Sequence, residues 1–327
     1  MNRFEVRIIE RTEELPALNG NNFFHSRELF ELTRKTPRQK PYMVLIMSQE
    51  GHVVAHLLGI VRYRASWLPP YFFMHCRVLG EGDYQEDITA KDKAELFQMM
   101  LHALRKHLGN RMLYIEVSNL SQKMFAYKEF RQQQFFPVRW MSIHNSLHSR
   151  LPEERINDRM KKRIETAYQR GVTTGEVESE EDFVAFSKLL RRHHWLKPKR
   201  YIPSDIFFRS IMEQQLGRLY VTKYHDRVIG CSAVAYSSEN AYLWYSAFRR
   251  KSFAFVHPDL LTIWHAIKDA HQRGYQHIFF LDVGLPFRKN PFREFILSFG
   301  GKPVSTHRWF RCSIKWINSF LTWIYRD

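Results

Sequence analysis

The sequence has few cysteines and no long apolar run, and both absences exclude classes of protein. Its three cysteines, Cys76, Cys231 and Cys312, lie far apart and form no Cys-x-x-Cys pair. Three separate thiols cannot close a disulfide framework, so we expect a reducing compartment. No run of about 18 apolar residues exists, and the charged segment 1–11 contains no apolar signal-peptide core. We therefore expect a cytoplasmic protein with no transmembrane segment.

Two kinds of catalytic centre are also missing from the sequence. The adjacent residues His193 and His194 have no partner at metal-ligand spacing, so no metal site is predicted. No Ser/His/Asp or Cys/His arrangement of the kind that activates a nucleophile is recognisable. An enzyme with this sequence would act mainly by holding its substrates in register.

Acidic residues are outnumbered by basic ones. The chain has 50 Lys and Arg against 33 Asp and Glu, a net charge of +17, and the excess is larger in residues 151–327 than in residues 1–150. A surface this basic attracts phosphates, nucleic acid or the anionic face of a membrane, and the charge alone does not distinguish these partners. The length of 327 residues predicts about two domains.

An internal repeat with a period of about 170 residues organises the chain. Each half contains a hairpin, an amphipathic helix, a buried strand, and a short helix that leads into a final strand. We expect these elements at 42–64, 93–107, 112–117 and 127–138, and again at 219–237, 258–273, 278–283 and 292–304. A unit of this kind repeated twice predicts two mixed α/β domains, residues 1–150 and 151–327.

A basic helix is expected between the two repeats, over residues 155–170. Ile156, Met160, Ile164 and Ala167 form an apolar stripe, beside a basic flank that consists of Arg155, Arg159, Lys162 and Arg163. This helix is either a solvated linker or a face that receives phosphates or RNA.

Three passages resemble one family. They are FFHSRELFEL (23–32), the stretch 155–190, in which a basic helix precedes Gly-Val and an acidic turn, and the helix–Gly–strand–Asp-x-Gly stretch 257–284. The order of elements resembles the GNAT acyltransferase fold, and its tandem duplication resembles the Fem-type (FemABX) peptidyltransferases and the Acetyltransferase-6 group. The resemblance implies two GNAT-like domains, each a mixed twisted sheet flanked by helices.

The resemblance also implies an activity. Fem-type enzymes take an amino acid from aminoacyl-tRNA and attach it to an amine of a peptidoglycan precursor. This implies an acyl- or aminoacyltransferase with anionic partners, which are tRNA, CoA or a nucleotide-linked precursor. Two departures weaken the aminoacyl-tRNA interpretation, and the first of them, Ile296, motivates a second hypothesis, a non-catalytic binding protein. Ile296 stands where the family often has a Lys that could steady an oxyanion, and residues 171–215 leave no room for a coiled-coil arm.

An acyl-CoA donor is the further alternative, because GNAT enzymes bind its pyrophosphate with Arg/Gln-x-x-Gly-x-Gly/Ala before a helix. Residues 77–82 fit this pattern, although Glu81 and Asp83 would repel phosphate, and residues 249–254 fit with Ser252 in place of the first glycine. The cations Arg249, Arg250 and Lys251 precede a predicted helix start at Pro258. They form either a solvated turn or a contact with phosphate or RNA.

Asp282 and Tyr245 are the predicted catalytic residues, because a strand ending at Asp282 and its neighbour near Tyr245 should border the substrate crevice. Asp282 would accept a proton or only cap a loop. Arg288 and Lys289 in the following loop either bind a substrate carboxylate or phosphate or are solvated. The full set of predicted substrate-binding residues is Arg249, Arg250, Lys251, Arg288, Lys289, Arg293, Lys162 and Arg163.

The segment 309–326 mixes aromatic residues with cations. It predicts either a last strand and a helix packed on the core, or peripheral attachment to an anionic membrane.

Overall fold

The computed structural model describes residues 4–66, 70–194, 201–281, 283–285 and 289–326. The chain forms two compact units. Unit 1 consists of Met1–Trp140 and Ser305–Asp327, and unit 2 of Met141–Val304. The predicted boundary was at residue 150. In the structure the first segment of unit 1 ends at Trp140, and the last 23 residues of the chain also belong to unit 1.

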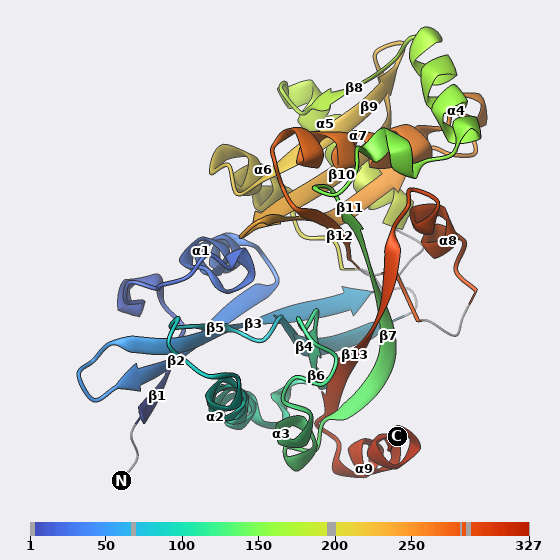
Figure 1. Ribbon diagram of the computed structural model, residues 1–327. Coiled ribbons are helices and arrows are strands. Elements are labelled where there is room, and N and C mark those ends of the chain that lie inside the picture. Colours follow the sequence, from blue (N-terminus) through green and yellow to red (C-terminus); the bar gives the residue numbers. More distant parts are fainter. Residues whose placement is uncertain (1–3, 67–69, 195–200, 282, 286–288, 327) are drawn as a thin grey trace. The chain divides into compact units, whose positions relative to one another are not determined.

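Unit 1 contains a sheet in the order β1-β2-β3-β4-β6-β13, in which β4 and β6 are parallel and the other neighbours antiparallel. Its helices lie on both faces, with α1 on one and α2 and α3 on the other (Figure 1). The elements are β1 (Phe4–Ile9), η1 (Thr12–Glu14), η2 (Phe23–His25), α1 (Arg27–Lys35), β2 (Gln39–Ser48), β3 (Val53–Ser66), β4 (Tyr71–Leu79), β5 (Asp83–Tyr84), α2 (Ala90–Leu108), η3 (Gly109–Arg111), β6 (Tyr114–Ser118), α3 (Tyr127–Gln132), the start of β7 (Phe136–Ser146), the end of β13 (Lys302–Cys312), and α9 (Lys315–Ile324).

Unit 2 repeats this plan with a sheet in the order β7-β12-β11-β10-β9-β8, in which β11 and β12 are parallel. The elements are η4 (Pro152–Arg155), α4 (Asp158–Gln169), β8 (Val172–Glu176), α5 (Glu180–His194), α6 (Asp205–Glu213), β9 (Gly217–Tyr224), β10 (Arg227–Ser237), β11 (Asn240–Phe248), η5 (Ala254–Val256), α7 (Pro258–Gln272), β12 (His277–Phe280) and α8 (Pro291–Leu297). The mixed α/β class is confirmed, and so are both predicted hairpins, β2–β3 and β9–β10.

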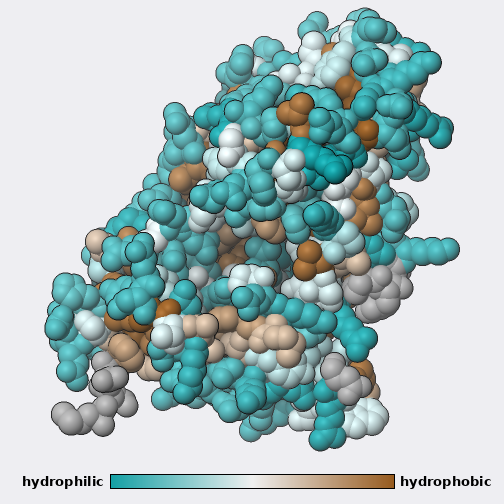
Figure 2. Space-filling model, in the orientation of Figure 1, coloured by the Kyte–Doolittle hydropathy of each residue, from teal (hydrophilic) through white to brown (hydrophobic). Residues whose placement is uncertain are grey.

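Each unit has its own hydrophobic core. In unit 1, alternate residues of β2 such as Val44 and Ile46 are fully buried together with Phe97 and Leu104 of α2. In unit 2, α4 and α7 share a core with β10 and β11, to which α4 contributes Ile164. With these side chains inside, the face of the molecule in Figure 2 is largely hydrophilic, and its apolar residues form small separate patches.

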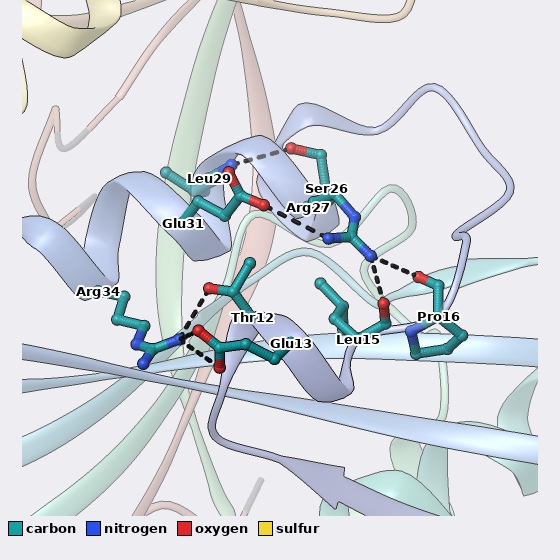
Figure 3. A network of polar contacts seen from close by, with 9 residues as sticks. All are labelled: Thr12, Glu13, Leu15, Pro16, Ser26, Arg27, Leu29, Glu31 and Arg34. Carbon is teal, nitrogen blue, oxygen red and sulfur yellow. Dashed lines mark hydrogen bonds and ion pairs between the residues drawn. The ribbon is translucent and has the colours of Figure 1, made fainter.

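Local capping explains how the predicted segments begin. Thr89 caps α2 by accepting a hydrogen bond from the Asp92 amide at 3.2 Å. Ser26 caps α1 in the same way through the Leu29 amide, as Figure 3 shows. Beside it, the Arg27 guanidinium donates to the carbonyl oxygens of Leu15 and Pro16. These contacts anchor segment 23–32 on unit 1 and give it a structural role.

The final strands of the two repeats are exchanged. β7 ends the first repeat, yet its residues 143–146 pair with β12 in unit 2. β13 ends the second repeat, yet its residues 309–312 pair with β6 in unit 1. Each sheet is therefore completed by the strand of the other repeat, which is why the observed boundaries differ from the predicted ones.

Candidate functional site

Two parallel strands of unit 2 separate before β11 ends. β11 pairs with β12 from Asn240 to Leu243, and the last bond joins the Leu281 amide to the Leu243 carbonyl oxygen at 3.3 Å. The described part of β12 ends at Phe280, whereas β11 continues to Phe248. Residues 244–248 therefore have a main-chain edge that β12 does not cover. This is where the predicted crevice was placed.

A β-bulge lies at the point of separation. β10 pairs Val234 with Leu243 but Ala233 with Tyr245, so Trp244 is an extra residue in β11. Without the bulge, the two-residue period would place Tyr245 on the same face as Leu243. The structure instead packs Tyr245 against Phe208 of α6, with ring centroids 5.3 Å apart, and leaves it 3% exposed. Tyr245 is thus at the predicted strand, but its ring is part of the core.

The equivalent region of unit 1 is closed. β4 and β6 pair from His75 to the last residue of β4, and the Gly80 amide adds a bond of 2.7 Å to the Ser118 carbonyl oxygen. The Gly82 amide donates to His25 at 3.1 Å, and the Arg77 guanidinium lies 3.4 Å from a Glu116 carboxylate oxygen. The groups of the 77–82 motif that would bind pyrophosphate are therefore used within the fold.

Unit 2 has a basic pocket at the start of α7, which we call the α7 pocket. It has a volume of about 440 Å³ and is lined by residues of α4, of the loop that follows β11, of α7 and of α8. The lining residues are Asn157, Arg159, Met160, Arg163, Arg250, Ala254, His257, Asp259, Leu260, Phe295 and Ser298. The structure thus brings together two predicted anion-binding segments, the basic helix and the turn 249–251.

The electrostatics of the α7 pocket are dominated by arginines. Burial lowers the pKa of His257 below its ordinary value, and the positive charges of Arg163, Arg170 and Arg250 lower it further, while Asp259 opposes them. His257 precedes α7 in the left-handed conformation, with φ of 46°. That conformation is costly for a residue other than glycine and is enriched at functional sites. The pocket therefore presents a neutral imidazole among cations at neutral pH.

Asp259 occupies the N-terminus of α7. Its carboxylate accepts a hydrogen bond from the Leu260 amide at 3.0 Å and pairs with the Arg250 Nε at 3.2 Å. Asp259 is 8% exposed, so its charge lies inside the pocket wall. A carboxylate there already provides the negative charge that a helix N-terminus favours. An external phosphate would gain less from this helix end than from the pocket arginines.

The cations of turn 249–251 have different surroundings. Burial and the charges of Arg227 and Arg192 lower the pKa of Arg249, and its Nε is buried with no hydrogen-bond partner in the described part of the chain. Arg249 therefore belongs to a second basic cluster with Arg192 and Arg227. Lys251 is exposed, and so is Lys162 of α4, and neither is among the described residues that line the α7 pocket.

The loop after β12 holds the remaining predicted residues. Asp282 and Arg288 lie outside the described residues, and Lys289 is exposed. Arg293 is 5% exposed, and its guanidinium donates to the Leu285 carbonyl oxygen, so it supports this loop. Ile296, at the position of the family lysine, is fully buried in the core of unit 2.

Sequence reasoning missed several residues of this region. Asn157, His257 and Asp259 line the pocket but carry no motif, and only their neighbouring arginines could have indicated them. At the end of α5, His194 Nε2 lies 3.2 Å from the Ser246 carbonyl oxygen, and His193 Nδ1 lies 3.3 Å from that of Phe248. The sequence analysis considered these two histidines only as metal ligands. In the structure they contact the part of β11 that does not pair with β12.

The sheet order and the separated parallel strands define a GNAT-like fold in unit 2. Residues 157–289 match the model of the acetyltransferase (GNAT) domain family, Acetyltransferase-6, so unit 2 carries a GNAT domain. Among curated proteins, none matches the sequence.

Solved structures extend the likeness to both units. The chain is similar to the crystal structure of FemX at 12% identity and a TM-score of 0.60, covering 99% of this chain and 100% of FemX. It is similar to L-PGS from Bacillus licheniformis at 11% identity and a TM-score of 0.58, covering 94% and 93%. A tandem GNAT protein from the clavulanic acid biosynthesis pathway is 11% identical, with a TM-score of 0.54 and 88% of each chain covered. The expected tandem GNAT-like fold is confirmed.

Proposed function

We propose that this protein is an acyl- or aminoacyltransferase that forms an amide bond on an amine acceptor, with its reaction centre in unit 2. The α7 pocket is the observation that carries the proposal. Arg159, Arg163 and Arg250 converge there from two segments, in the unit whose parallel strands separate. Arginines in a partly closed pocket suit phosphate, and amides on the part of β11 that β12 does not pair with suit a substrate carbonyl.

Aminoacyl-tRNA is the donor that we propose. Pyrophosphate binding by GNAT enzymes uses glycines before a helix, and residues 249–257 contain none. The N-terminus of α7, the position at which GNAT enzymes hold pyrophosphate, is here already occupied by the Asp259 carboxylate. The second cluster of Arg192, Arg227 and Arg249 would favour a donor that carries several phosphates.

The proposed acceptor is an amine of a peptidoglycan precursor, as the Fem-type resemblance implies. Its nitrogen bonds to the carbonyl carbon of the aminoacyl ester, the ester C–O bond breaks, and the ribose oxygen leaves with a proton. Amides of Ser246 and Phe248 would hold the developing oxyanion, which supplies on the order of 3 kcal/mol per donor. Asp282, two residues after β12, is the proposed acceptor of the amine proton, and Asp282→Asn should slow turnover about a hundredfold.

A donor screen tests the proposal. Aminoacyl-tRNAs and acyl-CoAs are each incubated with the protein and nucleotide-linked peptidoglycan precursors, and products are detected by mass spectrometry. A mass increase equal to one amino-acid residue supports the proposal. An increase equal to the acyl group of the CoA ester would show that the donor is acyl-CoA and not aminoacyl-tRNA. Binding of tRNA or precursor without any product would support the non-catalytic binding protein, for which Ile296 is the motivating residue.

A further inference from the structure

The C-terminal helix α9 exposes an aromatic face. Trp316, Phe320, Trp323 and Ile324 are 73%, 54%, 66% and 50% exposed, and their spacing of four, three and one places them on one side of the helix. The Phe320 and Trp323 rings stack with centroids 6.2 Å apart. A helix of a water-soluble domain normally turns its apolar face toward the core, so the orientation of α9 is inverted.

Polar contacts on the opposite side hold α9 in this orientation. Asn318 is 5% exposed, accepts a hydrogen bond from the Cys312 amide at 2.8 Å, and donates to the Gln134 carbonyl oxygen at 3.0 Å. Tyr325, directly after the helix, stacks on Phe136 with ring centroids 5.6 Å apart. In Figure 1, α9 follows the end of β13 as the last element of the chain. The aromatic face is thus turned outward by specific contacts within unit 1.

The surroundings of α9 are basic. Residues 305–326 of unit 1 contain no Asp or Glu and four cations, which are Arg308, Arg311, Lys315 and Arg326. A cavity of about 440 Å³ is lined by His102, Arg105, Lys106, Gly109, Asn110 and Arg311. Arg311 is four residues before α9, and the Ser313 amide bonds to the Leu113 carbonyl oxygen at 3.1 Å, so this cavity adjoins the start of the helix.

Arg311 points to an anionic partner. Its Nε is buried with no hydrogen-bond partner among the residues that the structure describes. Burial and the neighbouring charge of Arg105 lower its pKa, so its charge is poorly compensated within the protein. A phosphate in the cavity would supply the missing acceptor.

We propose that α9 and this cavity bind the surface of an anionic phospholipid bilayer. Trp316, Phe320 and Trp323 enter the boundary between headgroups and acyl chains, and Arg105, Lys106 and Arg311 contact lipid phosphates. The positive charge argues against a second copy of the chain, because two such faces would repel each other. This inference stands on unit 1 and does not depend on the proposed transfer reaction.

Cosedimentation with vesicles tests the inference. The full chain is mixed with vesicles of phosphatidylcholine alone or with about one third phosphatidylglycerol, and tryptophan emission is recorded in parallel. We expect binding to the anionic vesicles with a blue shift of emission, and weakening of that binding as salt rises. The variant W316S/F320S/W323S should lose on the order of tenfold or more of the affinity. Phe72→Ser, which removes another exposed aromatic residue of unit 1, should keep it.

Three outcomes would overturn the inference. The first is that the wild type does not bind anionic vesicles. The second is that the triple variant binds them as tightly as the wild type does. The third is that the wild type binds neutral and anionic vesicles equally and that R311Q leaves this binding unchanged. Sedimentation velocity tests the remaining alternative, that a second copy of the chain binds the aromatic face of α9. If the wild type is a dimer that the triple variant converts to a monomer, without vesicle binding in either, the face is a self-association surface.

Discussion

Removing the acid of the α7 pocket should strengthen anion binding. A phosphate bound to the Arg250 guanidinium would lie roughly 6 Å from the Asp259 carboxylate, because that carboxylate is 3.2 Å from Arg250 Nε. Two unit charges at this separation repel by about 1–3 kcal/mol at an effective dielectric constant of 20–40. Asp259→Asn keeps the acceptor for the Leu260 amide. We therefore expect pyrophosphate to bind about five- to 150-fold more tightly to this variant.

Isothermal titration calorimetry with inorganic pyrophosphate measures this effect at fixed ionic strength. Asp158→Asn is the matched control, because Asp158 is also an acid of unit 2 but is fully exposed on α4 and is not part of the described pocket lining. It should change the affinity by less than about twofold. The variant D259N should also lose roughly 0.3–1 kcal/mol of stability, since a charge at a helix N-terminus is removed. Unchanged or weaker binding by a folded D259N protein would refute this account of the pocket.

Two further predictions concern stability. Burial lowers the pKa of His25 and of His75 to about 3. Their unfolded forms bind protons below pH 6.5, so the free energy of unfolding should fall by about 2 kcal/mol for each between pH 8 and pH 5. Urea titrations measure this, and a flat pH profile would contradict neutral buried imidazoles. A Cβ at Gly230 would lie 2.0 Å from a buried threonine oxygen. Gly230→Ala should therefore destabilise unit 2 by about 1–3 kcal/mol, whereas Gly175→Ala meets open space and should cost less than about 1 kcal/mol in thermal or urea unfolding.

Much of the fold could be predicted because it follows from local patterns. The alternation in 42–64 and 219–237 predicted the hairpins, and helical periodicity predicted α2 and α7. The exchange of β7 and β13 could not be predicted, because the two final strands follow similar short helices and no local pattern in the sequence assigns either strand to a sheet. Strand pairing between such equivalent segments is decided by tertiary packing, which a local pattern does not encode.

The candidate site was predicted only in part. The basic helix and turn 249–251 were each identified by charge, but their convergence on one pocket joins residues 87 positions apart, Arg163 and Arg250. Tyr245 was placed on the right strand, and the bulge at Trp244 then turned its ring into the core. No sequence signal marks that bulge, because it depends on how β10 and β11 pair.

The central claim is that the α7 pocket binds the phosphate-bearing donor. The most direct test compares kcat/KM for aminoacyl-tRNA between two variants with the same change in charge. One replaces the pocket residues Arg159, Arg163 and Arg250 by Ala, and the other replaces Arg150, Lys188 and Lys302, which are exposed residues of the same unit outside the pocket. We predict a loss of about a hundredfold or more in the pocket variant, since three converging phosphate contacts are removed, and less than about fivefold in the other. Equal losses in both variants would mean that only the overall charge matters, and would contradict the claim.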